Sequence, residues 1–214
     1  MIRRAVAAGL CAGLFGLLTA LVAARHGAPF GFDEEVHRWS VQHRPCVAVA
    51  LARGITATGS GPVPYGCAIA AGLIAGRGRN GRMAAVACAL GFLLLAQGVR
   101  YLVMYEVARP RPPVADWAAL ATGFAYPSGH ATTSALVAGV LAWAAWRTAT
   151  PAAARCYAAL AACWAVTVGL TRIYLGVHWP TDVLGGWLYA LTWLAAAALV
   201  AAAAETAVRG RHPV

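Results

Sequence analysis

Long runs of apolar residues without charge are the feature that most limits how this chain can fold. The first run, residues 5–24, holds 20 residues and no charged side chain. About 20 apolar residues in an α-helix cross the ~30 Å hydrocarbon core of a bilayer. A secretory signal peptide has a shorter apolar core of about 7–15 residues, so we expect this run to be a retained membrane-spanning helix. Five further spans are predicted at residues 62–76, 83–107, 128–146, 152–174 and 180–204.

The composition agrees with a polytopic membrane protein. Hydrophobic residues make up 61% of the 214 residues and charged residues 11%, whereas soluble domains are about 45–50% apolar and about 25% charged. This balance excludes a disordered chain and argues against a soluble enzyme. The formal net charge is +10. Because the arginines are spread between the apolar runs and do not form one basic patch, we expect no nucleic-acid partner. They suit the anionic headgroups of a bilayer instead.

Arginines in the connections between the predicted spans indicate the orientation. They precede the first span, separate the second from the third and the fourth from the fifth, and follow the sixth: Arg3, Arg4, Arg77, Arg79, Arg82, Arg147, Arg155, Arg209 and Arg211. By the positive-inside rule, both termini are then cytoplasmic in a multi-pass protein of the plasma membrane. Heavy use of Ala and Gly, with Arg as the basic residue, suggests a bacterial gene rich in GC.

Two shorter helices are expected between the first and second spans. Residues 31–44 place Phe32, Val36 and Trp39 at i, i+4 and i+7, which is typical of a short interfacial helix. Residues 47–58 are expected to form a helix that leads into the second span. The predicted fold class is therefore all-α, a polytopic membrane bundle of about six transmembrane helices with a short interfacial helix. The six cysteines are expected to be buried small hydrophobic residues.

Four polar groups remain once the arginines of the connections are set aside. They lie at residues 109–112, 127–130, 171–172 and 178–182, each where a predicted span begins or ends. With the orientation above, all four emerge on the same, non-cytoplasmic side of the membrane. Ionisable residues at such positions are costly and point to function. We therefore expect them to meet in one pocket.

The residue types in this pocket favour an anion and proton transfer. Arginine forks match phosphate oxygens in pairs, and Ser128 at the start of a helix would leave the N–H groups of Gly129 and His130 free. Asp182, in the first turn of the last span, can turn back toward His178 and fix its tautomer. The other ring nitrogen is then a base, a metal ligand or a nucleophile. With only three candidate ligands present, a metal site is not expected.

These residues resemble the type 2 phosphatidic acid phosphatase family, which shares its core with vanadium haloperoxidases. Residues 127–130 match the family's Pro-Ser-Gly-His, and Arg172, His178 and Asp182 match the spacing of its last motif, with Thr171 where Ser is usual. Arg111 and Pro112 match the end of the first motif. The lysine of that motif falls on Met104. Either Arg100, one helical turn earlier, takes its place, or no cation does.

The resemblance covers about residues 32–200 and implies a metal-independent phosphatase without a cofactor. It implies one membrane-embedded phosphatase domain over residues 1–214, with a motif-bearing core at about 83–200. His178 would attack phosphorus to form a phosphohistidine, Asp182 would orient His178, and His130 would protonate the leaving oxygen and then activate water. The phosphate oxygens would be held by the remaining polar residues of the motifs: Arg111, Ser128, Gly129, Arg172 and, as the replacement for lysine, Arg100.

The position at the outer membrane face favours a lipid headgroup as substrate. Phosphatidic acid, phosphatidylglycerol phosphate and an undecaprenyl-type polyprenyl diphosphate all fit. Two alternatives remain open: a lipid phosphotransferase that uses the same site with an alcohol acceptor, and a non-catalytic transporter or structural homologue. The sequence does not indicate the oligomeric state.

Overall fold

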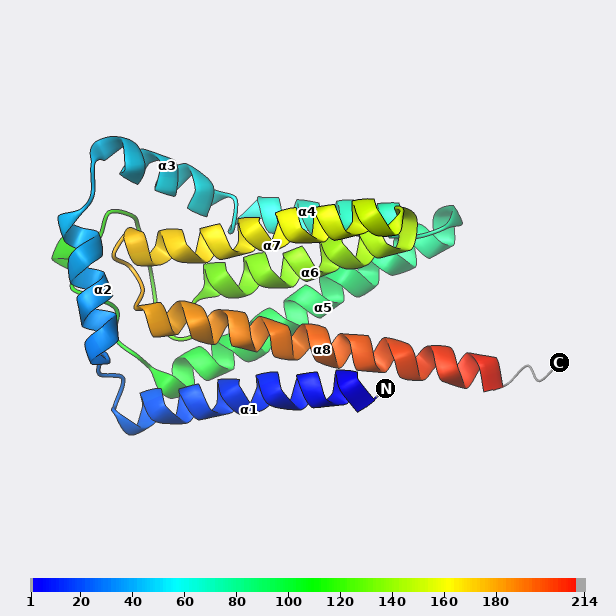
Figure 1. The fold of residues 1–214 in the computed structure, drawn as a ribbon, viewed down its shortest axis with the longest axis horizontal. Helices are drawn as coiled ribbons and strands as arrows, with labels where there is room; N and C mark the ends of the chain where they lie inside the picture. The colour runs from blue at the N-terminus through cyan, green and yellow to red at the C-terminus, as the bar shows by residue number, and fades with distance from the viewer. Residues whose placement is uncertain (1, 211–214) are drawn as a thin grey trace.

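The structure, a computed structural model, describes residues 2–210 as an all-helical bundle without strands in that range (Figure 1). The elements, in chain order, are α1 (Ile2–Ala24), α2 (Gly31–Gln42), α3 (Cys46–Ala57), α4 (Pro62–Ala75), α5 (Gly78–Val107), a 3₁₀ turn η1 (Val114–Asp116), α6 (Gly129–Thr148), α7 (Pro151–Tyr174) and α8 (Pro180–Gly210). The all-α prediction is confirmed.

Each of the six apolar runs forms a helix, and the two shorter predicted helices are present as α2 and α3. Within the described residues, four helices are long and apolar enough to cross a membrane: α1, α5, α7 and α8. The other two, α4 and α6, do not meet that description, because α4 has only 14 residues and α6 begins with several polar side chains. A count of six spans therefore stays a prediction.

The sequence marks several helix boundaries by local chemistry. α7 starts with Pro151 directly after Thr150, whose hydroxyl accepts a hydrogen bond from the backbone N–H of Ala153. α5 ends at Val107, and the next residue, Ala108, adopts a left-handed conformation with φ of 46°. This turn sends the chain out of the bundle into the loop that carries Arg109 and Arg111.

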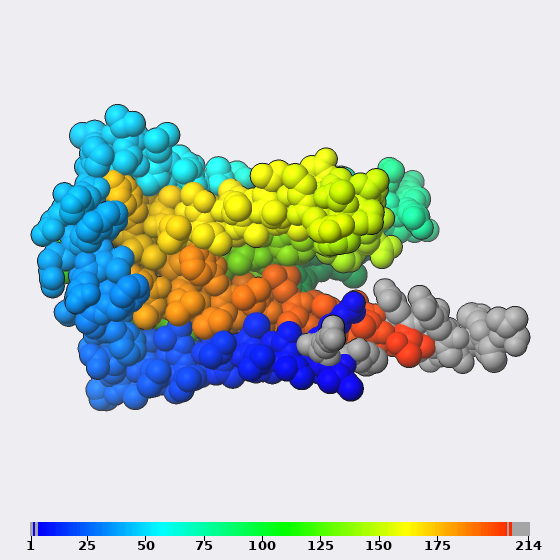
Figure 2. All heavy atoms as spheres, viewed as in Figure 1, coloured from blue at the N-terminus to red at the C-terminus, as the bar shows by residue number. Residues whose placement is uncertain are grey.

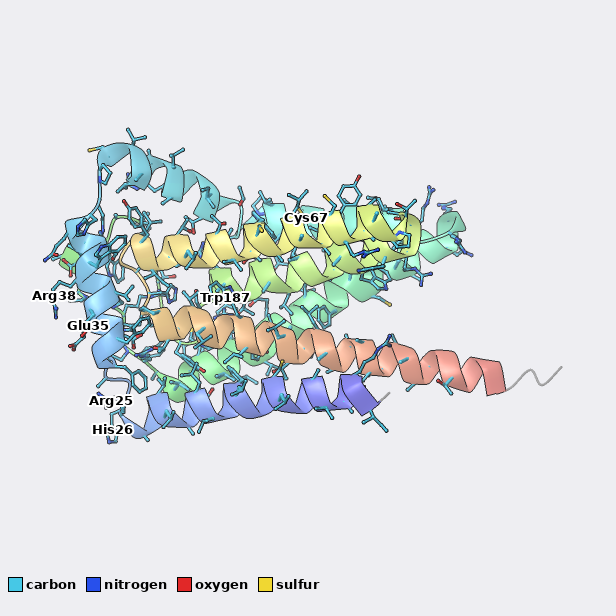
Figure 3. The ribbon with its side chains drawn as sticks, viewed as in Figure 1. Arg25, His26, Glu35, Arg38, Cys67 and Trp187 are labelled. Carbon is cyan, nitrogen blue, oxygen red and sulfur yellow. The ribbon has the colours of Figure 1, made fainter. Side chains whose placement is uncertain are left out.

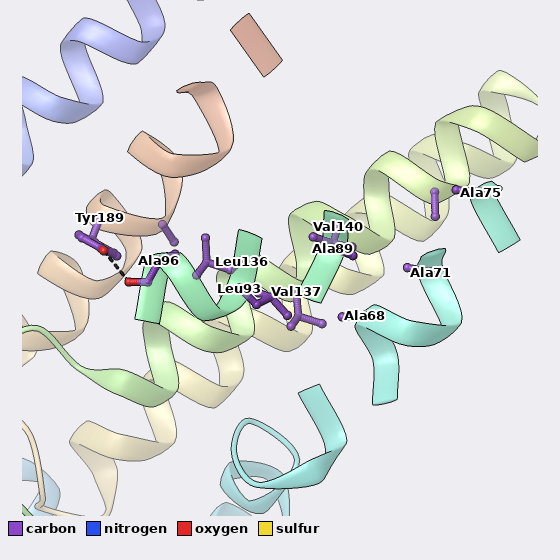
Figure 4. Close-up of a cluster of buried hydrophobic side chains, with 12 residues drawn as sticks. Ala68, Ala71, Ala75, Ala89, Leu93, Ala96, Leu136, Val137, Val140 and Tyr189 are labelled. Atoms are coloured by element: carbon purple, nitrogen blue, oxygen red, sulfur yellow. Dashed lines mark hydrogen bonds between the residues drawn. The ribbon is translucent and has the colours of Figure 1, made fainter. Parts of the chain in front are cut away.

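The core is built around α6, which packs against α4, α5, α7 and α8. Its buried side chains meet small alanines of α4 and α5, which let the helices approach closely (Figure 4). The Tyr189 hydroxyl donates a 2.6 Å hydrogen bond to the Ala96 carbonyl and links α8 to α5. Tight packing around α6 holds the first turn of this helix, and the residues on it, in place.

The outer surface of the bundle is apolar. Leu10, Leu14 and Leu17 of α1 are each more than half exposed. The prediction that the cysteines are buried is wrong, since four are exposed and Cys11 and Cys67 are only partly covered. In a bilayer such positions meet hydrocarbon, so an apolar side chain needs no place in the protein core.

The two ends of the bundle differ. α2 lies across one end, where it covers the start of α8 (Figures 1 and 2). The ends of α1 and α8 that carry the chain termini lie at the opposite end, together with the α4–α5 and α6–α7 turns. Arg147 donates a hydrogen bond there to the Ala75 carbonyl at 3.5 Å. Arg211, which was assigned to a terminal cytoplasmic segment, lies outside the described residues.

Candidate active site

Backbone hydrogen bonds bring the four polar segments together at the α2 end. The Ser128 N–H donates to the Asp182 carbonyl at 3.0 Å, which ties the start of α6 to the first turn of α8. The Ala125 N–H donates to the Arg109 carbonyl at 2.8 Å, and the Val177 N–H to the Arg172 carbonyl at 3.2 Å. Segments that are up to 73 residues apart in sequence therefore share one site.

His178 and Asp182 form a buried pair at the start of α8. His178 lies on the loop before the helix and Asp182 in its first turn, and the His178 Nδ1 is 3.3 Å from the Asp182 Oδ2. The Trp179 N–H donates to the same carboxylate oxygen at 2.8 Å. A carboxylate next to Nδ1 favours the tautomer with its proton there, which leaves a lone pair on Nε2.

Arg111 faces that lone pair. Its Nη1 lies 2.8 Å from the His178 Nε2. Four backbone carbonyls accept hydrogen bonds from the same guanidinium and fix its plane: Thr122, Gly123, Phe124 and Val177. A permanent cation is thus held rigidly where an anion bound at Nε2 would need one.

Ser128 and Arg172 each carry a buried polar atom without a partner. The Ser128 hydroxyl and the Arg172 Nε make no hydrogen bond, although both residues are almost fully buried. Arg172 donates one bond, from Nη1 to the Thr56 hydroxyl at 3.2 Å. Buried polar atoms are ordinarily hydrogen-bonded, so these two are suited to the oxygens of a bound anion.

His130 and Arg100 line a cavity of about 230 Å³ between the start of α4, the outer part of α5 and the first turn of α6. Arg100 donates from Nε to the Gln97 Oε1 at 2.7 Å and from Nη1 to the Met104 sulfur at 3.7 Å. Its guanidinium carbon lies 3.4 Å from where a Cβ on Gly129 would stand. Arg100 therefore does reach the start of α6, over the backbone of Gly129.

The site includes Arg109, which belongs to a predicted polar group, and Asp33, which was not predicted. Arg109, two residues before Arg111, turns the other way and forms buried ion pairs with Asp33 of α2 and Asp182. The repeated Arg-Pro at residues 109–112 is a sequence signal for Arg109, but the sequence offers no motif that singles out Asp33. Nothing in the local pattern around Asp33 distinguishes it from its exposed neighbours Glu34 and Glu35.

The donor set offers no metal centre in the described residues 2–210, where no three His, Cys, Asp or Glu side chains gather. The site offers hydrogen-bond donors instead: the Arg111 guanidinium next to the His178 Nε2, the Arg172 Nε without a partner, and the Ser128 hydroxyl at the start of α6. Such a set binds an oxyanion and stabilises charge that develops on it.

Comparison with known proteins agrees with the resemblance in the motifs. The family model described as PAP2 superfamily matches residues 84–205. An undecaprenyl-diphosphatase from Sulfolobus acidocaldarius is 38% identical over 69 residues, 31% of this chain, and a phosphatidylglycerophosphatase B from Escherichia coli is 42% identical over 83 residues, 35% of this chain. In these matches the chain spans only 29% and 30% of the relatives' lengths.

A solved structure shares the fold over nearly the whole chain. It is the transmembrane PAP2 type phosphatidylglycerolphosphate phosphatase from Bacillus subtilis, with a TM-score of 0.74 and 24% sequence identity. The superposition covers 93% of this chain and 96% of the other. The helical bundle described above is therefore a known transmembrane architecture.

From the burial of His178 and the arginines next to it, we expect its ring to stay neutral in mildly acid solution. Burial, and then the charges of Arg111 and Arg172, hold the pKa of the His178 ring well below its usual value of 6.5. In substrate-free protein in detergent, ¹⁵N NMR of labelled histidine at pH 6 should show this ring in the neutral form. The His178→Ala variant assigns the signal. An imidazolium spectrum for His178 at that pH would contradict the described electrostatics.

Proposed function

The chain belongs to the PAP2 superfamily, and on that premise we propose that it is an integral-membrane, metal-independent phosphatase of lipid phosphates or diphosphates. The observation that carries the proposal is the pair of contacts on His178. Its Nδ1 faces the Asp182 carboxylate at 3.3 Å and its Nε2 faces Arg111 at 2.8 Å. The His178 ring is thereby oriented as a nucleophile. It also lies next to Arg111, a cation that can bind the phosphoryl group under attack.

In the proposed reaction, the Nε2 lone pair of His178 attacks phosphorus and the bond from phosphorus to the lipid oxygen breaks. His130 donates a proton to that leaving oxygen, so that a neutral lipid alcohol or a lipid monophosphate departs. His130 then takes a proton from water, which attacks the phosphohistidine. The N–P bond breaks, free phosphate leaves, and the lone pair returns to Nε2.

The phosphoryl oxygens have several donors at hand. Arg111 and Arg172 supply charge, and the Ser128 hydroxyl and the Gly129 N–H supply hydrogen bonds at the start of α6. In the transition state the transferred group spreads negative charge over its equatorial oxygens. The packing of α6 and the four carbonyls that hold Arg111 fix these donors before the substrate binds. They can therefore stabilise the charge of the transition state without reorganising.

A lipid substrate follows from where the site lies. The relatives are named for undecaprenyl diphosphate and phosphatidylglycerophosphate, and the cavity beside Arg100 and His130 lies at one end of an apolar bundle. A headgroup can reach this depth while its tail stays in the bilayer. We place this end outside the cytoplasm and both termini inside, since the α4–α5 and α6–α7 turns, the two cytoplasmic connections by the positive-inside rule, lie at the opposite end (Figure 1).

Replacing the nucleophile tests the proposed function. The purified His178→Ala variant should lose at least about a thousandfold of its activity toward a panel of phosphatidic acid, phosphatidylglycerol phosphate and undecaprenyl diphosphate in detergent. Chelators should leave the wild-type rate unchanged, and vanadate should inhibit it. Phosphate release is measured with and without an added alcohol acceptor, which separates hydrolysis from transfer. Full activity of His178→Ala would refute the proposal.

Arg100 is proposed to fill the role of the lysine that Met104 replaces. The Arg100→Gln variant should raise KM and the inhibition constant of vanadate by about tenfold, the effect of losing roughly 1.4 kcal/mol of anion binding. Adding Met104→Lys to that variant should restore both constants, because a lysine there stands one turn along the same helix face. Unchanged constants in Arg100→Gln would show that Arg100 does not bind the anion.

A further inference from the structure

Arg109 is a fully enclosed charge that is shared between two carboxylates. Its side chain, like those of Asp33 and Asp182, has no exposed surface. Nη2 donates to the Asp33 Oδ2 at 2.7 Å and Nη1 donates to the Asp182 Oδ1 at 2.6 Å. The chain of contacts runs from α2, through the loop after α5, to the carboxylate that faces His178.

Asp33 also holds the first turn of α8. Its Oδ1 accepts hydrogen bonds from the Thr181 N–H at 3.0 Å and from the Thr181 hydroxyl at 2.9 Å. That hydroxyl lies 2.7 Å from the Arg109 Nη1 as well. Because Thr181 directly precedes Asp182, the contacts of Asp33 fix both the charge beside the catalytic carboxylate and the backbone that carries it.

The charge balance explains why two carboxylates are useful. Arg109 with Asp182 alone would be a neutral pair. That pair would attract a positively charged His178 ring less strongly than an unpaired carboxylate would. Asp33 adds a second negative charge, so the three buried groups sum to one net negative charge next to that ring. Transfer of a phosphoryl group to Nε2 makes the ring more positive, and the low dielectric of a buried site strengthens its attraction to that charge.

We propose that Asp33 is a positioning residue for phosphoryl transfer, acting through Arg109 and Thr181 on Asp182 and so on His178. This inference rests on the proposed function of the site. Asp33 belongs to α2, outside the three motifs, about 150 residues from the nucleophile in sequence. It makes no contact with His178, so its effect must appear in the rate of attack and not in the binding of the phosphate.

The test compares Asp33→Asn with Glu35→Gln. Asn keeps the shape of Asp33 but removes its charge and puts an amide NH2 in place of one of its two accepting oxygens, whereas Glu35 lies exposed on the outer side of the same helix (Figure 3). Single-turnover rapid quench with a ³²P-labelled lipid phosphate gives two quantities: the rate constant for phosphoenzyme formation and the amount of phosphoenzyme per chain. We expect Asp33→Asn to lower the rate constant by about tenfold or more with an unchanged amount per chain. Glu35→Gln should match the wild type in both.

The two quantities separate positioning from folding. If Asp33 only supports the fold, Asp33→Asn lowers the amount of phosphoenzyme per chain and leaves the rate constant of the active fraction unchanged, which overturns the inference. A wild-type rate constant in Asp33→Asn overturns it too. If Asp33→Asn yields no folded protein, Thr181→Val is measured instead. Removal of its hydroxyl should slow attack several-fold, and an unchanged rate would overturn the inference.

Failure of the proposed function gives a different result. In that case the wild-type protein itself forms no acid-labile phosphoenzyme from any lipid phosphate in the panel. If the wild type forms phosphoenzyme and Asp33→Asn forms it equally fast, the function stands and only the role of Asp33 fails.

Discussion

The buried guanidinium of Arg109 is the interaction on which the arrangement of the site depends. Taking a charge out of water is costly, and removing one partner of a buried ion pair costs about 3–5 kcal/mol. Arg109 offsets that cost with two carboxylates, the Thr181 hydroxyl and the Gly27 carbonyl. These partners come from three separate parts of the chain. Once they close around Arg109, α2, the loop after α5 and the start of α8 have fixed positions relative to one another.

The polar site of the bundle lies at this end, where α2, the loop after α5 and the start of α8 meet. The apolar outer surface and the core of small side chains specify how the helices pack. The reactive groups gather where the helices begin: His130 on α6, and His178 and Asp182 around the start of α8. Arg109 and Arg111 leave the same loop in opposite directions. The first pairs with the Asp182 carboxylate, and the second faces the His178 Nε2.

Much of this could be predicted from the sequence because the signals are local. Apolar runs predicted the six long helices and an amphipathic pattern predicted α2, whereas the 3₁₀ turn η1 was not predicted. The motifs singled out His178, Asp182 and Arg111, which the structure brings together. The pairing of Asp33 with Arg109 could not be predicted, since an ion pair across 76 positions between a helix and a loop leaves no periodic pattern. Cysteine burial was misjudged for a related reason. Composition shows that a side chain is apolar but not whether protein or lipid covers it.

The central claim is that the Nε2 of His178 is the atom that bonds to phosphorus. A crystal structure of the protein with vanadate, which copies five-coordinate phosphorus, tests this most directly. The account predicts vanadium bonded to the Nε2 of His178, with its equatorial oxygens on Arg111, Arg172 and the start of α6. Vanadate bonded to His130, or bound away from both histidines, would contradict it.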